Sequence, residues 1–477
     1  MKPKVPLILG FDGLSLDEDT KRHLAEINPW GIILFKRNLD NEEQIRWLIA
    51  ELRALLSPVL ISLDHEGGVV NRFPANFAFP PSAYALSHLE DPISLKKAAK
   101  MLAALPAHFG FDLNFAPCID LFDSVSPVIG IRGFSADPNA VANWGLAVLE
   151  AHKEAGMLSV AKHFPGHGRA FEDSHFKAGE VAFTRQSLDE LDLVPFKKLI
   201  EGGVPLVMPA HLTYLDLDPE YPASLSERVL SGILKRELGF KGLVVSDCLE
   251  MQGLSVRFAP KEMIELGANA GLDLWVSSYS LKKDRFFQRQ LAEVLRSEEI
   301  MGPNARIEAL FNRPKPTQPL PLGGISEALD LRQKTLKVEG QPIRHGGPWH
   351  LIEVSARRFE GINADQVQTS LIRKMAEQLA PVERYSQISL SNLKALEDIV
   401  VESKGRGELV LLITRNARFH EAWEEAQIVL GRGGAVIHLD LSDGEDQVVP
   451  ALQKWSCFGY DSLSLQLLCG ELIARIA

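Results

Sequence analysis

The chain has 477 residues, of which 46% are hydrophobic and 24% are charged, values that are ordinary for a soluble globular protein. Its formal net charge of −11 argues against a nucleic-acid partner, because such a partner needs a basic face. No stretch reaches the roughly 18 uninterrupted apolar residues of a membrane-spanning helix, so we expect no membrane span. At roughly 100–200 residues per domain, the length predicts two domains.

The first twenty residues contain two lysines and a short apolar stretch, which the sequences FDG and LDEDT interrupt. This pattern predicts a first β-strand rather than a signal peptide. The four cysteines lie far apart, at Cys118, Cys248, Cys457 and Cys469. Because they show no paired spacing, we expect free thiols in a reducing compartment and a cytoplasmic protein.

Eight short apolar runs follow one another through the first 280 residues. They lie at 6–13, 30–35, 59–68, 111–120, 157–164, 205–212, 242–251 and 271–278. Segments between them, such as 41–56, 91–109 and 225–238, have apolar residues at three- and four-residue spacing, with Asp91 and Ser226 as expected helix starts. Buried strands that alternate with helices predict a TIM-like (β/α)8 barrel, with a doubly wound open sheet as the alternative.

Most of these runs end in a polar or ionisable residue. The residues at these ends are Asp12, Asp64, Asp120, His163, His211 and Asp247. In a (β/α)8 barrel the carboxyl ends of all strands meet at the rim that carries the active site. The pattern therefore predicts an enzyme whose site lies at that rim.

The composition changes after about residue 300. Residues 312–324 are rich in proline and glycine, and a charged amphipathic stretch follows them. We therefore assign residues 1–311 to the barrel, 312–345 to a connector and 346–477 to a small α/β domain. In that last part, apolar runs at 350–355, 408–416 and 434–442 alternate with helical segments at 364–380 and 417–431. This domain shows no catalytic pattern, so packing or docking is its expected role.

The segment AKHFPGHGRAFEDSH, residues 161–175, is rich in histidine and allows two interpretations. In the first, His163 and His167 bind a metal together with Asp173 and His175. However, the proline and glycines of FPGHG disfavour the helix that would align the first two histidines, and no His-Glu-x-x-His pattern is present. In the second, Asp173 orients His175 for proton transfer. A surface loop with incidental charges is the alternative to both.

Asp247 follows an apolar, β-branched run, so we expect it at the tip of a strand. A carboxylate there is a candidate nucleophile, metal ligand or structural cap. A carboxylate paired with a proton donor across a sugar ring is the arrangement of retaining glycosidases, although here the donor would be an imidazole.

Taken together, several motifs resemble glycoside hydrolase family 3, and in particular its β-N-acetylglucosaminidase branch. The motifs are KHFPGHG with DSH, LDHEGGVVNRF, SPVIGIRGF, VMPAH, PASLS and VSDCLEM, over residues 5–300. The resemblance implies that Asp247 is the nucleophile, and that His175, with Asp173 as its partner, is the acid/base. It also implies a set of sugar-binding residues, namely Asp64, Arg72, Arg132, Lys162, His163 and His211. It implies no metal and no cofactor.

The resemblance further implies a retaining enzyme that removes terminal β-linked GlcNAc from muropeptide fragments such as GlcNAc–1,6-anhydroMurNAc, with no oligomeric state indicated. Two departures are visible: Val69 stands where the family usually has arginine, and SHFKAGEV differs from the expected continuation after the dyad. Both bear on neighbouring subsites. The alternatives are a β-N-acetylglucosaminide phosphorylase, a β-glucosidase of the same family and a non-catalytic sugar-binding scaffold.

Overall fold

The computed structural model describes most of the first 340 residues and part of the remainder. The described residues are 3–74, 76–89, 91–123, 129–170, 179–278, 281–296, 304–313, 316, 318–340, 349–355, 382–389, 393–406, 409–415, 436–440, 453–456 and 464. The predicted helical segments 364–380 and 417–431 lie outside them. Across the part of the chain that is described, none of the helices is both long and apolar enough to cross a membrane.

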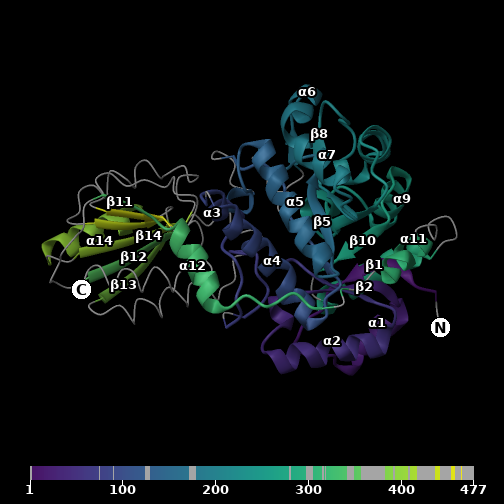
Figure 1. Ribbon diagram of the computed structural model, residues 1–477, viewed down its shortest axis with the longest axis horizontal. Coiled ribbons are helices and arrows are strands. Elements are labelled where there is room, and N and C mark those ends of the chain that lie inside the picture. Colours follow the sequence, from purple (N-terminus) through teal and green to yellow (C-terminus); the bar gives the residue numbers. More distant parts are fainter. Residues whose placement is uncertain are drawn as a thin grey trace.

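Eight parallel strands form a closed barrel, shown at the right of Figure 1. In the order in which they pair, these strands are β1 (Val5–Leu9), β10 (Leu274–Ser277), β9 (Leu243–Cys248), β7 (Leu206–Pro209), β5 (Leu158–Phe164), β4 (Leu113–Asn114), β3 (Leu60–Leu63) and β2 (Pro29–Leu34). Each of the eight predicted runs overlaps one of them. The first and last strands pair directly, with Leu7 opposite Trp275, so the predicted barrel is confirmed and the open sheet is excluded.

Helices surround the barrel and follow the strands along the chain. They are α1 (Glu18–Ile27), α2 (Glu42–Leu56), α3 (Ala83–Ser87), α4 (Pro92–Phe109), α5 (Pro138–Glu154), α6 (Arg185–Ser187), α7 (Leu193–Glu201), α8 (Gln252–Ser255), α9 (Pro260–Ala270) and α10 (Leu281–Leu295). Two π-helical segments, η3 (Leu188–Asp192) and η5 (Arg228–Glu237), and three 3-10 turns, η1 (Lys36–Asn38), η2 (Gly130–Arg132) and η4 (Ala223–Leu225), complete the layer. A short ribbon of β6 (Gly179–Val181) and β8 (Leu212–Tyr214) lies outside the barrel sheet.

The predicted helix starts are present. The Asp91 carboxylate accepts hydrogen bonds from the backbone amides of Ile93 and Ser94, and Pro92 occupies the first turn. Ser226 Oγ accepts from the amide of Val229 at 3.1 Å, which caps the segment that continues as η5. Each cap satisfies amides that have no partner within the helix, so these short polar residues determine where the two helices begin.

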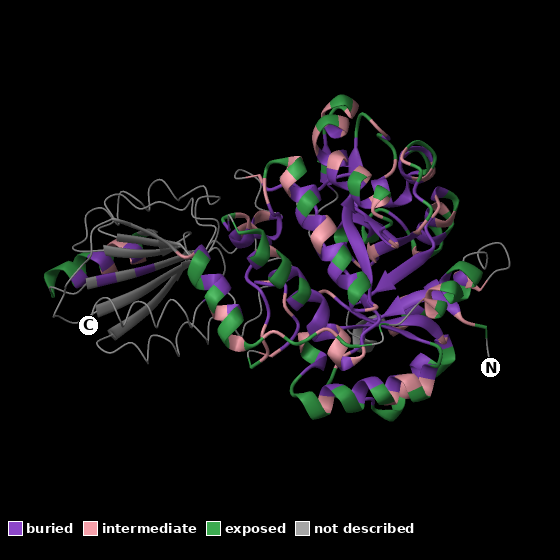
Figure 2. Ribbon diagram, in the orientation of Figure 1, coloured by how far each residue is buried: buried purple, intermediate pink, exposed green. Residues whose placement is uncertain are grey.

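The barrel strands are largely buried (Figure 2), and their apolar side chains form two layers. Alternate strand residues such as Leu7 and Leu9 pack against the helices, while Ile8 and its counterparts from the other strands form a separate inner cluster. Ile307 of α11 (Asn304–Ala309) belongs to this inner cluster, and Phe311 of η7 (Leu310–Asn312) packs against it. The segment after the last barrel strand therefore closes the end of the barrel opposite to the strands' carboxyl ends.

The second part of the chain contains a six-stranded sheet, shown at the left of Figure 1. Its strands, in spatial order, are β11 (Lys337–Gly340), β16 (Gln453–Ser456), β15 (Val436–Asp440), β14 (Leu409–Arg415), β12 (Trp349–Ser355) and β13 (Val382–Ser389). All neighbours are parallel except β11 and β16. Helix α14 (Leu393–Gly405) packs on β13 and β14. Strands β13 and β16 were not anticipated, and β11 lies in the segment assigned to the connector.

Helix α12 (Ile325–Thr335) joins the barrel to this sheet. The side chain of Arg332 is buried and donates to the backbone carbonyls of Phe79 and Pro80 in the barrel part. The same guanidinium donates to Ser464 Oγ, which follows the last strand of the second sheet. One buried arginine therefore bridges the two parts of the chain, since a buried guanidinium requires a partner for each of its donors.

Candidate active site

A cavity of ≈ 220 Å³ opens at the carboxyl ends of the barrel strands. Its lining comprises Phe35, Arg37, Asp64, Glu66, Val70, Arg72, Arg132, Lys162, His163, Met208, Asp247, Cys248, Met251 and Ser278. Six of these are residues that the sequence assigned to the site: Asp64, Arg72, Arg132, Lys162, His163 and Asp247. They come from the ends of β3, β5 and β9, from the loop that follows β3 and from η2, so residues distant in the sequence share one cavity.

Charged side chains form a buried network along one side of this cavity. Lys162 Nζ contacts Asp64 Oδ1 at 2.9 Å and Glu66 Oε1 at 2.6 Å. Arg132 binds Glu66 through two hydrogen bonds of 2.9 Å, in the two-pronged geometry that suits a guanidinium and a carboxylate. Arg72 reaches Asp64 Oδ2 at 3.4 Å. Three cations and two carboxylates are therefore held in fixed relative positions.

The network keeps Glu66 and Lys162 ionised despite their burial. Burial alone would raise the pKa of Glu66, but the charges of Arg132 and Lys162 hold that pKa well below its usual range. Burial likewise opposes the charge on Lys162, yet Asp64 and Glu66 raise its pKa above the ordinary value. The cavity wall therefore presents permanent donors and acceptors for a ligand rich in hydroxyl groups.

The turn after β3 brings two carboxylates to the cavity. Gly67 and Gly68 have φ angles of +87° and +50°, a conformation that residues with a Cβ rarely adopt. A Cβ on Gly68 would lie 2.6 Å from the backbone nitrogen of Ser82. The paired glycines of DHEGG therefore allow a tight turn that places Asp64 and Glu66 in the same wall.

The end of β5 contributes two consecutive residues, Lys162 and His163. Successive side chains of a regular strand point to opposite faces. Here the pairing of β5 with β7 shifts register between Lys162 and Phe164, so both neighbours reach the same cavity. His163 Nδ1 lies 2.6 Å from Asp120 Oδ2, and its Nε2 lies 4.0 Å from Asp247 Oδ2.

Asp247 lies at the tip of β9, as expected, and its side chain is 21% exposed. The amide of Cys248 donates to Asp247 Oδ1 at 2.7 Å, and Oδ2 is the oxygen nearest to His163. Asp247 therefore lines the cavity with one carboxylate oxygen bound to a backbone amide, which is a position suitable for a candidate nucleophile.

The remaining predicted site residues are His211, Asp173 and His175. His211 is buried next to Ser224, with its Nδ1 2.7 Å from Ser224 Oγ, and it is not among the described residues that line the cavity. The predicted acid/base pair, Asp173 and His175, lies outside the described residues. The structure adds Glu66 to the cavity lining. Glu66 belongs to the DHEGG motif, and a charged residue directly before a pair of glycines is the sequence signal that could have identified it.

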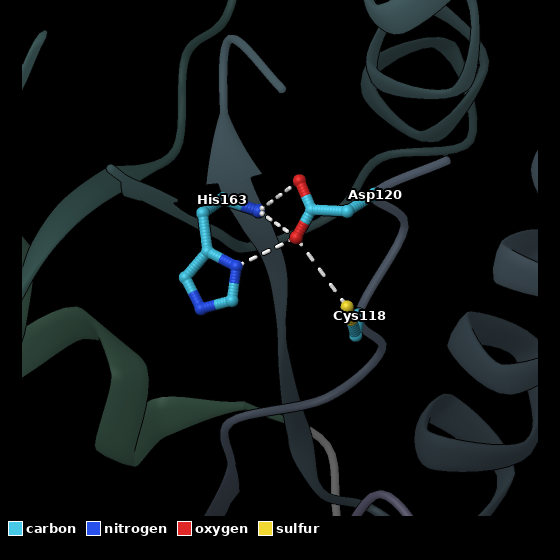
Figure 3. A group of neighbouring side chains, drawn as sticks. All are labelled: Cys118, Asp120 and His163. Atoms are coloured by element: carbon cyan, nitrogen blue, oxygen red, sulfur yellow. Dashed lines mark hydrogen bonds and ion pairs between the residues drawn. The ribbon is translucent and has the colours of Figure 1, made fainter. Parts of the chain in front are cut away.

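Among the described residues, one group of histidine, cysteine and carboxylate side chains lies close enough together to hold a metal ion: Cys118, Asp120 and His163 (Figure 3). Two ligands of a tetrahedral zinc ion, each about 2.0 Å from the metal, lie roughly 3.3 Å apart. The His163 Nδ1 to Asp120 Oδ2 distance of 2.6 Å is shorter and corresponds to a hydrogen bond. The group as arranged fits hydrogen bonding better than shared metal ligation.

Comparison with known proteins identifies the class to which this barrel and its charged cavity belong. Residues 7–313 match the N-terminal domain of glycosyl hydrolase family 3. The chain belongs to this family, and the predicted glycoside hydrolase is confirmed.

Individual relatives point to one branch of the family. A protein of Neisseria meningitidis serogroup B named beta-hexosaminidase is 38% identical over 280 residues, which span 57% of this chain and 77% of that protein. The structure of NagZ from Neisseria gonorrhoeae in complex with N-trifluoroacetyl-D-glucosamine is 33% identical, with a TM-score of 0.57, and covers 65% of this chain and 93% of that one. The resemblance to β-N-acetylglucosaminidases is therefore confirmed.

The second part of the chain also has a counterpart in a solved structure. A family 3 beta-N-acetylglucosaminidase from a Paenibacillus species superimposes with a TM-score of 0.80 at 25% identity. That superposition covers 99% of this chain and 95% of the other. The arrangement of a barrel followed by a smaller α/β part is thus shared with another member of the family.

Proposed function

We propose that this protein is a retaining exo-β-N-acetylglucosaminidase in which Asp247 is the nucleophile and His175, oriented by Asp173, is the acid/base. The observation that carries the proposal is the position of Asp247, whose carboxylate reaches a cavity lined by permanently charged side chains. The relatives named beta-hexosaminidase support the substrate class. So does the N. gonorrhoeae protein, whose structure contains an N-acylated glucosamine.

In the first step, one oxygen of Asp247 forms a bond to the anomeric carbon as the bond to the leaving oxygen breaks. His175 donates a proton to that oxygen, so the aglycone leaves as an alcohol. In the second step, His175 removes a proton from water, the resulting hydroxyl bonds to the anomeric carbon, and Asp247 is released. Two inversions at the same carbon retain its configuration.

The charged network would bind the sugar hydroxyls. Asp64 accepts hydrogen bonds, while Arg72, Arg132 and Lys162 donate them, and a charged partner strengthens each bond. The cavity of ≈ 220 Å³ is smaller than the roughly 300–1,000 Å³ of sites for drug-sized ligands. That volume suits a single sugar unit, which supports removal of one terminal residue at a time.

We further propose that the natural substrate is a muropeptide fragment such as GlcNAc–1,6-anhydroMurNAc, and that the enzyme acts in the cytoplasm in cell-wall recycling. This part follows from the family resemblance and from the absence of paired cysteine spacing in the sequence. Release of GlcNAc from purified muropeptides, followed by mass spectrometry, tests it. If aryl β-GlcNAc is cleaved but muropeptides are not, the natural substrate is a different glycoside.

Turnover of nitrophenyl β-GlcNAc and nitrophenyl β-glucoside by the wild type, Asp247→Ala and His175→Ala tests the mechanism. We expect hydrolysis of the first substrate only, loss of turnover in Asp247→Ala, and a smaller loss in His175→Ala because nitrophenol needs little protonation to leave. The first-formed sugar should be the β-anomer by NMR. Negligible turnover by folded wild-type protein would overturn the proposal, and GlcNAc-1-phosphate formed in phosphate buffer would identify a phosphorylase instead.

A further inference from the structure

Asp120 is a buried carboxylate beneath the end of β5 that the mechanism above does not use. Its side chain is at the centre of the group in Figure 3. Oδ1 accepts hydrogen bonds from the backbone amides of His163, at 3.2 Å, and His167, at 2.7 Å. Oδ2 lies 2.6 Å from His163 Nδ1, accepts from the His163 amide at 3.2 Å and contacts the Cys118 thiol at 3.4 Å.

This carboxylate is ionised in the folded protein. Burial opposes its charge, but His163 and the hydrogen bond from the His167 amide hold the pKa of Asp120 at about 2. An ionised carboxylate only accepts hydrogen bonds. His163 Nδ1 must therefore carry a hydrogen, which determines how the two ring nitrogens are used.

The other edge of the His163 imidazole, which carries Nε2, faces Asp247. In Figure 3 the second ring nitrogen, Nε2, lies on the side of the ring away from Asp120, and its distance to Asp247 Oδ2 is 4.0 Å. His163 also lines the cavity, so the ring stands between a buried carboxylate and the candidate nucleophile.

We infer that Asp120 is a positioning residue that acts through His163, keeping Nδ1 protonated and the Nε2 edge directed at Asp247 and the sugar. An aspartate that orients a catalytic imidazole through Nδ1 is a known way to select one tautomer. The inference rests on the proposed function for its effect on turnover, but the tautomer is a property of the free protein. Cys118, the remaining contact of Oδ2, is a weak donor and adds little to this orientation.

The two oxygens of Asp120 have different partners, because Oδ1 accepts only from backbone amides and Oδ2 faces His163 Nδ1. The variant Asp120→Asn can therefore separate the support of the turn from the orientation of the imidazole. The amide oxygen of asparagine can replace Oδ1 and keep the bonds from the His163 and His167 backbone amides. The amide nitrogen then replaces Oδ2 and presents a donor to His163 Nδ1. The turn after β5 is retained, while the ring must give up its Nδ1 hydrogen or rotate.

The first experiment is a double-mutant cycle on nitrophenyl β-GlcNAc with Asp120→Asn, His163→Ala and the double variant. We expect Asp120→Asn to lower kcat/KM roughly 10- to 100-fold, as is typical of residues that orient another functional group. In the His163→Ala background the same substitution should have less than about a twofold effect. Equal, additive losses in both backgrounds would show that Asp120 acts on the structure as a whole, and would overturn the inference.

The control is Asp112→Asn, at the other end of the barrel. Asp112 is also buried and precedes β4, and its carboxylate binds the Ile61 amide, Arg53 and Arg313. This variant makes the same chemical change in a buried carboxylate far from His163. We expect its kcat/KM to equal that of the wild type, and thermal unfolding of every variant establishes which of them are folded.

The second experiment uses the wild-type protein and needs no activity. NMR of protein labelled with 15N in histidine, with the His163 signals assigned by their loss in His163→Ala, reports which ring nitrogens carry hydrogen. We expect a protonated Nδ1 in the wild type and its loss in Asp120→Asn. An unprotonated Nδ1 in the wild type contradicts the inference even if the enzyme is active. If Asp120→Asn does not fold, the spectrum of the wild-type protein is sufficient to test the inference.

Discussion

Each end of the barrel contains a buried carboxylate that is paired with two cations, but the two ends use these ion pairs differently. At the carboxyl end, Lys162 and Arg132 share Glu66 beside an open cavity. At the opposite end, Arg53 and Arg313 share Asp112. There both arginines also donate to backbone carbonyls, those of Gly110 and Gly156 among them.

The difference shows that a cavity alone does not identify the site. A space of ≈ 500 Å³ lies at the Asp112 end, lined in part by Arg53 and Arg313, and is larger than the active-site cavity. Its charged groups bind loop carbonyls and thereby hold connecting segments in place. At the Asp247 end the charges surround a volume that a ligand can enter, so the substitutions below should affect the two ends differently.

Asp247→Ala should give the largest effect, a loss of roughly 10⁴-fold or more in kcat, because the proposed covalent step loses its proposed nucleophile. Its free energy of unfolding should stay within about 1 kcal/mol of the wild type, since the side chain is partly exposed. Turnover of aryl β-GlcNAc and urea denaturation measure the two quantities. Added azide, a small external nucleophile, should restore part of the turnover as glycosyl azide, and its failure to do so would argue against this role.

Glu66→Gln should reduce both activity and stability. It removes the charge that Lys162 and Arg132 share, and breaking a buried pair costs roughly 3–5 kcal/mol. Urea denaturation and aryl-glycoside kinetics test this. The matched control is Glu42→Gln on α2, an exposed pair with Arg46 whose loss should leave the free energy of unfolding nearly unchanged, because water screens both charges. Equal destabilisation by the two variants would contradict the distinction between buried and exposed pairs.

Asp112→Asn should lower stability without lowering activity. The amide can still accept from the Ile61 amide, but Arg53 and Arg313 lose their anionic partner, so we expect a cost of about 2–3 kcal/mol. Urea denaturation gives the stability and aryl-glycoside hydrolysis gives kcat/KM. If kcat/KM also falls by more than a few fold, the two ends are coupled and the comparison above is wrong.

Acidification should destabilise the barrel below about pH 6.5. Burial lowers the pKa of His65 to about 3 and that of His152 to about 4, so the unfolded chain binds protons that the folded chain does not. Each histidine should then cost roughly 2 kcal/mol between pH 7 and pH 5. Urea denaturation at both pH values measures the change, and His152→Gln should reduce it by the roughly 2 kcal/mol that this one histidine contributes. An unchanged pH dependence in that variant would mean that other groups carry it.

Asp91→Ala should have the smallest effect, a slight lowering of the unfolding temperature with full activity. The carboxylate caps α4 through the Ile93 and Ser94 amides on the outside of the barrel. Thermal unfolding and aryl-glycoside kinetics test it. A loss of activity here would show that the outer helices influence the cavity.

Much of the fold and part of the site could be predicted from local patterns. The eight apolar runs predicted the barrel strands, because a strand buried on both faces needs a continuous apolar segment. Rim residues such as Asp64, His163 and Asp247 could be predicted because the topology of a (β/α)8 barrel brings all strand ends to one face. In the second part of the chain β13 and β16 were missed, since their polar residues interrupt the apolar pattern that identified the other strands.

The sequence by itself therefore determined the barrel, the rim and the chemical types gathered there, since each depends on patterns a few residues long. Only the tertiary structure decided which charges pair: that Glu66 binds both Lys162 and Arg132, that Asp120 binds His163, and that His211 packs against Ser224 away from the cavity lining. The reason is physical. Pairing depends on distances of a few ångströms between strands that are far apart in the chain. Side chains of the same type form a binding site where they lie beside open space, and they stabilise the fold where they lie beside backbone groups.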